Sequence, residues 1–165
     1  MTDIVNSVTF HDGHKAPRIG FGVWQVENDK VTDAIKTAVK TGYRLIDTAA
    51  IYGNEEGVGR AIKECDVERK DLFITTKVWN DRHGFDETMN KLGLDYIDLY
   101  LIHWPVPKIG LYVKTWEALM QLREEGRVRS IGVSNFNIEH LQLLLDETGV
   151  LPVVNQIELN PRFQQ

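Results

Sequence analysis

Short apolar runs alternate with stretches of helical periodicity along most of the chain. The runs are rich in Val, Ile, Leu and aromatic residues and are bounded by turn-forming residues, which is typical of strands. They cover residues 18–24, 43–47, 72–79, 96–104, 129–135 and 152–160. Between them, apolar residues recur three or four positions apart, as in amphipathic helices, at 29–40, 54–65, 115–126 and 137–149. This alternation predicts βαβ units and a parallel sheet.

Residues that favour helix ends flank the predicted helices. Side chains that can accept hydrogen bonds from the first helical N–H groups precede three of them: Asn28 or Asp29, Asn54, and Asn137. Gly42 and Gly126 follow two of them and predict C-terminal stops. Within the second helix, Gly57 and Gly59 would allow close packing of a neighbouring element.

A small hairpin is predicted before the first unit, at about residues 8–16, because Asp12-Gly13 is a strong turn signal. His11 and His14 flank this turn. We interpret both as solvated turn residues, since no Cys or carboxylate completes a metal-ligand set around them. We therefore expect no metal site.

Polar side chains follow the apolar runs at the point where each run ends. They are Asp47, Lys77, His103, Ser134 with Asn135, and Asn155 with Gln156. Parallel strands joined by helices carry all their carboxyl ends on one face, so these groups are predicted to share a rim. The steps between successive ends are 77−47=30, 103−77=26, 134−103=31 and 156−134=22 residues. A unit of an eight-unit barrel of about 250 residues uses about 31. The prediction is a (β/α)8 TIM barrel with its active site on that face.

Only about six of the eight βα units can be identified, within a single domain spanning residues 1–165. The third connection, DRHGFDETMNKLGLD, has room for barely two helical turns, which suggests missing residues there as well. An open, doubly wound sheet could use six strands, but it should carry G-x-G-x-x-G after its first strand. The segment IGFGVWQ lacks that motif, so we favour an incomplete barrel.

Three of the strand-end residues, together with Tyr52 in a neighbouring loop, predict carbonyl chemistry. Lys77 lies in an apolar strand, where its charge is costly unless a partner such as Asp47 neutralises it. Tyr52, in the loop after the second strand, would lie near this cation, which should lower the pKa of its phenol and make it a general acid. His103 could orient the same substrate oxygen. Because no side chain carries hydride, a nicotinamide cofactor is needed.

Neighbouring strand ends suggest binding groups. The side chains of Ser134, Asn135 and Gln156 suit a neutral carboxamide such as that of nicotinamide. Trp24, Trp79 and Trp104 could form an aromatic pocket for a small carbonyl compound. Taken singly, these residues have structural interpretations: an ion pair, a loop aromatic, a core histidine, a helix cap or core packing. Their occurrence at corresponding ends of successive strands favours a site.

Composition narrows the function further. The net charge is −5 and no Lys/Arg block exceeds a pair, so we expect no nucleic-acid binding. Cys65 is the only cysteine, so an intrachain disulfide framework is excluded, which suits a reducing compartment. We interpret Cys65 itself as a small buried apolar residue of a helix. The segment MTDIVNSVTF has neither the basic head nor the apolar core of a signal sequence, and no apolar stretch approaches 18 residues, so we expect neither a signal sequence nor a membrane span. We expect a cytoplasmic protein, without membrane partners, that is monomeric.

Several long motifs resemble those of the aldo-keto reductases: GYRLIDTAAIYGNEEGVGRAI, FITTKVWN, LDYIDLYLIHWPVP, IGVSNF and VNQIELNP. The strongest resemblance is to bacterial 2,5-diketo-D-gluconate reductases, and it runs from about residue 8 to residue 165. It implies a (β/α)8 barrel that reduces aldehydes and ketones with NADPH.

Residue by residue, the resemblance implies a catalytic tetrad of Asp47, Tyr52, Lys77 and His103, with Tyr52 as proton donor. The implied cofactor-binding residues are Asp47, Ser134, Asn135, Gln156 and Gly22, and the implied substrate-binding residues are Trp24, Trp79, His103 and Trp104. The implied substrate is a keto-sugar acid, an aldose or a 2-oxoaldehyde. The preference for NADPH over NADH comes from the family, because the late segments that grip the 2′-phosphate are not in this sequence. The alternative is a non-catalytic regulatory subunit that binds a nicotinamide nucleotide on the same fold.

Overall fold

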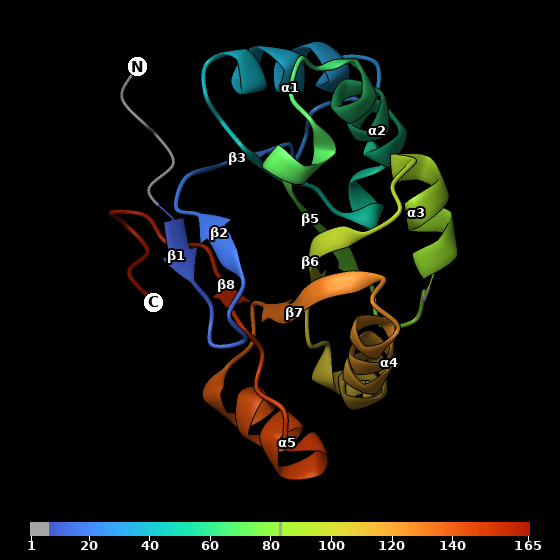
Figure 1. The fold of residues 1–165 in the computed structure, drawn as a ribbon. Coiled ribbons are helices and arrows are strands. Elements are labelled where there is room, and N and C mark those ends of the chain that lie inside the picture. The colour runs from blue at the N-terminus through green and yellow to red at the C-terminus, as the bar shows by residue number, and fades with distance from the viewer. Residues whose placement is uncertain (1–6, 83) are drawn as a thin grey trace.

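Six parallel strands form a curled sheet in which every strand pairs with its neighbour in sequence (Figure 1). The computed structural model describes residues 7–82 and 84–165. The strands of this sheet are β3 (Gly20–Gly22), β4 (Leu45–Asp47), β5 (Phe73–Val78), β6 (Ile97–Ile102), β7 (Val128–Ser134) and β8 (Asn155–Gln156). The sequential parallel order confirms the predicted succession of βα units in an incomplete barrel.

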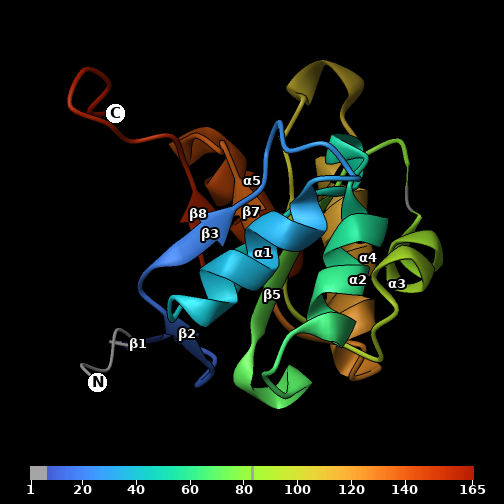
Figure 2. The ribbon, with the colours of Figure 1, turned by 90° about the horizontal axis from the view of Figure 1, so that it is seen from above.

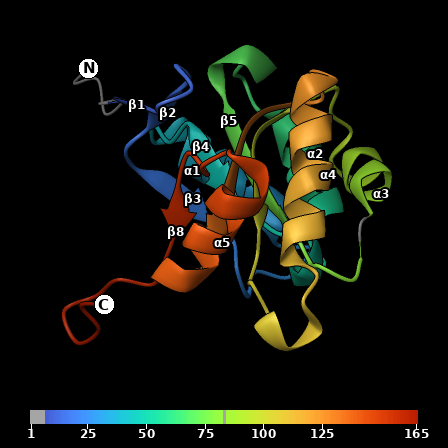
Figure 3. The same cartoon turned by 90° about the horizontal axis from the view of Figure 1, so that it is seen from below.

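The helices lie in an arc around the strands, from α1 through α2, α3 and α4 to α5 (Figure 1). They are α1 (Val31–Lys40), α2 (Glu55–Glu64), α3 (Phe85–Leu92), α4 (Tyr112–Glu124) and α5 (Ile138–Thr148), with 3-10 turns η1 (Ala50–Tyr52), η2 (Arg69–Asp71) and η3 (Pro107–Ile109). Residues after β8 extend away from the sheet, as the views from above and below show (Figures 2 and 3). None of the helices in the described part of the chain is long and apolar enough to cross a membrane.

Both faces of the central strands are buried, which explains why their sequences are apolar without alternation. Side chains of one parity, such as Ile74, Tyr100 and Ile131, pack with the helices in the larger core cluster. Side chains of the other parity, such as Phe73 and Leu101, form a smaller cluster on the concave face. Lys77 has the parity of Phe73 and therefore belongs to the concave face, where the site is built.

The N-terminal hairpin has the predicted form. β1 (Ser7–Thr9) pairs antiparallel with β2 (Lys15–Pro17), and Gly13 occupies the left-handed region with φ 91°. Asp12 also fastens the hairpin to the sheet, because its Oδ2 accepts a hydrogen bond of 2.7 Å from Ser130 Oγ. His11 and His14 are exposed at the turn, as expected.

Most predicted elements are shortened at their ends, and two differ more in their bounds, the last strand and the helix predicted at 115–126. The last strand is limited to Asn155–Gln156, because β8 pairs only with β7 among the described residues and the chain beyond it has no second ladder. The helix predicted at 115–126 begins earlier, at Tyr112. The third connection does contain a helix, α3, whose eight residues make about the two turns expected.

The helix ends follow the predictions in part. Gly42 and Gly126 have positive φ values of 109° and 73° just after α1 and α4. Asn137 caps α5 in a reciprocal capping box with His140. Neither Asn28 nor Asp29 caps α1, because the helix begins one residue later, after Lys30. Asn54 does precede α2, but its side chain makes no capping hydrogen bond and is used elsewhere.

The predicted role of Gly57 and Gly59 in close packing is supported by the space around them. A Cβ atom on Gly57 would lie 2.4 Å from the carbonyl oxygen of Asn28, and one on Gly59 would lie 2.5 Å from that of Leu92. These obstacles are backbone atoms, which cannot rotate away as a side chain can. α2 can therefore approach the segment before α1 and the end of α3 only with glycine at these positions.

Gly59→Ala should lower the free energy of unfolding by about 1–3 kcal/mol, because the added methyl group overpacks the contact between α2 and α3. Chemical denaturation of the variant and the wild type measures this difference. Gly84→Ala is the matched control, since its Cβ would meet only the flexible side chain of Glu87, at 3.4 Å. Equal losses in the two variants would contradict the packing role of Gly59.

Candidate active site

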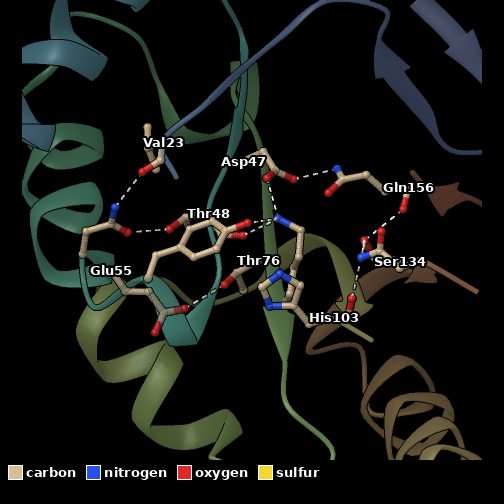
Figure 4. A network of polar contacts seen from close by, with 12 residues as sticks. Val23, Asp47, Thr48, Glu55, Thr76, His103, Ser134 and Gln156 are labelled. Atoms are coloured by element: carbon tan, nitrogen blue, oxygen red, sulfur yellow. Dashed lines mark hydrogen bonds and ion pairs between the residues drawn. The ribbon is translucent and has the colours of Figure 1, made fainter. Parts of the chain in front are cut away.

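The side chains of Asp47, Tyr52 and Lys77 converge at the carboxyl ends of β4 and β5. Lys77 Nζ lies 2.5 Å from Asp47 Oδ1, 2.9 Å from the carbonyl oxygen of Thr48 and 3.5 Å from Tyr52 Oη. Figure 4 shows this group of contacts, with Asp47 between the ammonium group and Gln156. The ammonium group therefore joins a carboxylate, a backbone carbonyl and a phenol at one point.

Strand register brings this group together. Asp47 pairs with Thr75 across β4 and β5, and Lys77 follows Thr75 by two residues on the same face. The Lys77 side chain is only 1% exposed, whereas that of Asp47 is 16% exposed. Burial lowers the pKa of Lys77, and the charge and hydrogen bond of Asp47 oppose that shift.

Tyr52 ends the 3-10 turn η1, and Gly53 follows in the left-handed region with φ 69°. Burial raises the pKa of Tyr52 to about 12, and the Asp47 charge acts in the same direction. The predicted lowering of this pKa by a nearby cation is therefore wrong for the protein alone. Lys77 is already paired with Asp47, whose negative charge disfavours the phenolate, and desolvation is the largest effect on this pKa. The phenol holds its proton at neutral pH.

His103 lies directly after β6, where its N–H donates a 3.0 Å hydrogen bond to the carbonyl oxygen of Val78. Its ring meets the rings of Tyr52 and Trp79 edge to face, with centroids 5.5 and 5.7 Å apart. Burial lowers the pKa of His103 to about 4, and the Lys77 charge adds to the shift. The imidazole is therefore neutral at pH 7 and can both donate and accept a hydrogen bond.

Uncharged polar groups occupy the next two strand ends. Gln156 Nε2 donates to Asp47 Oδ2 at 2.9 Å, and Ser134 Oγ donates to the carbonyl oxygen of Gln156, also at 2.9 Å. Asn135, with φ 62°, donates from Nδ2 to the carbonyl oxygen of His103 at 3.1 Å. Asn155 does not join them, because its amide bonds the backbone of Phe136 in both directions.

The three candidate pocket tryptophans differ in their surroundings. Trp79 is partly buried and contacts His103. Trp24 and Trp104 are 67% and 47% exposed, and no ring contact joins them to the others among the described residues. Gly22 pairs with Asp47 across β3 and β4, and a Cβ atom there would meet nothing within 4 Å. The rim therefore has open space beside the carboxylate.

Two side chains that support the site were not identified as site residues from the sequence. Asn54, expected only to cap a helix, is fully buried and bonded to Thr48 and to the backbone after β3. Asn80 is 2% exposed and donates to the carbonyl oxygens of Trp104 and Pro105. The sequence feature that could have identified them is their position, since Asn54 follows Tyr52 by two residues and Asn80 follows Lys77 by three. Nowhere in residues 7–82 and 84–165 do three His, Cys, Asp or Glu side chains gather as a metal site would require.

The chain matches a sequence model described as "Aldo/keto reductase family" over residues 18–165. It is 55% identical to methylglyoxal reductase DkgA of Escherichia coli (strain K12) over 163 residues, which cover 96% of this chain and 59% of that protein. It is 50% identical to an aldo-keto reductase of Mycobacterium sp. (strain KMS), again over 96% of this chain and 60% of the relative. The chain thus spans about 60% of the length of these relatives.

Solved structures are similar in fold. An aldo/keto reductase from Brucella melitensis superposes with a TM-score of 0.93 at 54% identity, over 98% of this chain and 66% of that one. A point mutant of Gox0644, solved in complex with NADPH, gives a TM-score of 0.91 at 50% identity, over 97% of this chain and 60% of that one.

The pH dependence of stability should report the burial of His103. Its pKa of about 4 in the folded state lies below the ~6.5 of an unfolded histidine. The contribution of the neutral imidazole to the free energy of unfolding is therefore complete above pH 6.5 and is lost as the pH falls through 4. The loss is on the order of 2 kcal/mol. Denaturant unfolding at pH 7 and pH 4.5 should show a smaller loss for His103→Gln than for the wild type. Parallel losses would contradict the shift.

Proposed function

Because the chain belongs to the aldo/keto reductase family, we propose that it reduces a small aldehyde or ketone with NADPH, using Tyr52 as the proton donor. The observation that carries this proposal is the convergence of three side chains: Lys77 Nζ lies 2.5 Å from Asp47 Oδ1 and 3.5 Å from Tyr52 Oη. This arrangement places the protonated phenol of Tyr52, at the end of η1, beside the buried cation of Lys77.

Reduction of a carbonyl group adds a hydride to carbon and a proton to oxygen. A bound NADPH supplies the hydride. Tyr52 donates its phenolic proton to the carbonyl oxygen, breaking its own O–H bond and leaving a phenolate 3.5 Å from the ammonium group of Lys77. A phenol with a pKa of about 12 is fully protonated before reaction. An ammonium group interacts more favourably with a phenolate than with a neutral phenol, so Lys77 would offset part of the cost of forming the phenolate in this buried place.

His103 orients the substrate oxygen in this proposal. Its low pKa keeps the imidazole neutral, so it can donate a hydrogen bond without competing with Tyr52 as an acid. The edge-to-face contact with Tyr52, with ring centroids 5.5 Å apart, places the two rings on adjacent sides of the same space.

The residues at the rim fit the nicotinamide part of the cofactor. Ser134, Asn135 and Gln156 offer a hydroxyl and two amides, which can pair with both the oxygen and the NH₂ of a carboxamide. The open space at Gly22, beside Asp47, would let a flat ring approach the backbone. These residues would hold the cofactor, and Trp24, Trp79 and Trp104 would contact the substrate.

We favour a 2-oxoaldehyde as the substrate over a keto-sugar acid or an aldose. The relatives at 55% identity include proteins named methylglyoxal reductase. The rings of Trp79 and His103 lie edge to face with centroids 5.7 Å apart, and walls so close together would suit a compact substrate with few polar groups.

Tyr52→Phe should lower kcat for methylglyoxal by about 10²–10⁴-fold, because it removes the proton donor. The rate of NADPH oxidation measures this loss, and NADPH binding, followed by fluorescence, should persist. Tyr43→Phe is the matched control, since Tyr43 packs against Phe21 at 5.7 Å between ring centroids, away from the site. Near-normal turnover by Tyr52→Phe would overturn the acid assignment.

The same assay separates the enzyme from a regulatory nucleotide-binding subunit. An enzyme consumes NADPH when a small aldehyde is added, and the decrease in absorbance of the reduced nicotinamide follows the aldehyde concentration. Steady binding of NADPH without consumption across several small aldehydes and ketones would favour the regulatory subunit.

A further inference from the structure

The carboxamide of Asn54 joins three segments behind the site. Its Oδ1 accepts a 2.7 Å hydrogen bond from Thr48 Oγ1, and its Nδ2 donates 2.9 Å hydrogen bonds to the carbonyl oxygens of Val23 and Val26. The side chain is fully buried, and both of its amide hydrogens and its oxygen are engaged. One side chain therefore fixes the chain leaving β3, the chain leaving β4 and the start of α2.

This use of Asn54 is unusual for its position. An asparagine that precedes a helix commonly accepts a hydrogen bond from the first turn of that helix. The Asn54 side chain makes no such bond and reaches across to other loops instead. A buried amide left without partners is costly, so its three hydrogen bonds restrict the relative positions of these loops.

A closed ring of contacts links Asn54 to the reacting phenol. Thr48 bonds Asn54 through its side chain and Lys77 through its carbonyl oxygen, at 2.7 and 2.9 Å. Lys77 contacts Tyr52 Oη at 3.5 Å, and Tyr52 precedes Asn54 by two residues. Thr48 therefore bonds Lys77 directly, and it is linked to Tyr52 only through Asn54, which lies two residues further along the chain.

The segment that carries Tyr52 has little packing of its own. The turn η1 contains no buried residue, and Ile51 within it is 57% exposed. A second anchor follows Asn54 directly, because buried Glu55 accepts a hydrogen bond from Thr76 at 2.7 Å (Figure 4). It accepts another from Thr88 at 3.2 Å. Polar contacts at the start of α2, rather than apolar burial of the turn, hold this segment on β5.

We propose that Asn54 and the hydroxyl of Thr48 are positioning residues that set the distance between Tyr52 Oη and Lys77 Nζ. This inference rests on the proposed function, because the distance matters only if Tyr52 donates the proton. Neither side chain needs to touch substrate or cofactor. Loss of the Thr48 hydroxyl should therefore lower kcat and leave NADPH affinity unchanged, since misplacement of a reacting group by about 1 Å can cost on the order of a hundredfold in rate.

The test is a graded series at Thr48. Thr48→Val keeps the shape and the backbone carbonyl but removes the donor to Asn54, and kcat should fall about tenfold to a hundredfold. Thr48→Ser keeps a hydroxyl and should keep kcat near the wild-type value. Thr48→Cys has a weaker donor, so its kcat should lie between those of the serine and valine variants. The series also keeps the inference testable if the valine variant fails to fold, because Ser and Cys must still differ.

Thr32→Val separates positioning from stability. Thr32 Oγ1 donates a 2.9 Å hydrogen bond to the carbonyl oxygen of Gly57, so this variant also removes a bond to α2, but not one near Tyr52. Thr32→Val and Thr48→Val should both lower Tm, and only the latter should lower kcat. A normal kcat in Thr48→Val, together with an inactive Tyr52→Phe, would overturn the positioning role alone. Wild-type protein that consumes no NADPH would overturn the proposed function, and this inference with it.

Discussion

The ammonium group of Lys77 is almost completely buried, and its charge must be neutralised where it lies. Asp47 does this at 2.5 Å, and the carbonyl oxygen of Thr48 accepts a further hydrogen bond. Because both partners come from the end of β4, the pairing holds the ends of β4 and β5 together. Within the described part of the chain, the ammonium group also lies 3.5 Å from Tyr52 Oη, so the phenol meets the buried charge at the same point.

Most of the site could be predicted because it follows from strand periodicity. In a parallel sheet, a polar residue at the end of an apolar run must lie on the carboxyl rim, so Asp47, Lys77 and His103 could be placed together. The strand order and the hairpin turn at Gly13 followed from equally local signals. The short β8 could not be predicted, because strand length depends on neighbouring ladders that an apolar sequence does not specify.

The side-chain partners and pKa values were not predictable in the same way. Asn54 carries a capping signal that is identical whether its amide bonds its own helix or two other loops. The pKa of Tyr52 depends on how deeply the phenol is buried and how near the Asp47 charge lies, and both are known only from the three-dimensional structure. The neighbours of Tyr52 could be identified from the sequence, but the predicted direction of its pKa shift was wrong, because burial of the phenol is the largest effect and the Asp47 charge acts in the same direction.

The raised pKa of Tyr52 is compatible with its proposed role as an acid. A donor must hold its proton until charge develops on the acceptor oxygen, and a phenol with a pKa of about 12 does so throughout the physiological range. Stabilisation by Lys77 then matters for the phenolate that forms, not for the phenol that precedes it. Lys77 thus has two partners that matter at different times. Asp47 pairs with it in the resting protein, and the phenolate of Tyr52 would interact with it only during the reaction. The distance between Tyr52 Oη and Lys77 Nζ is therefore the dimension on which the chemistry depends most.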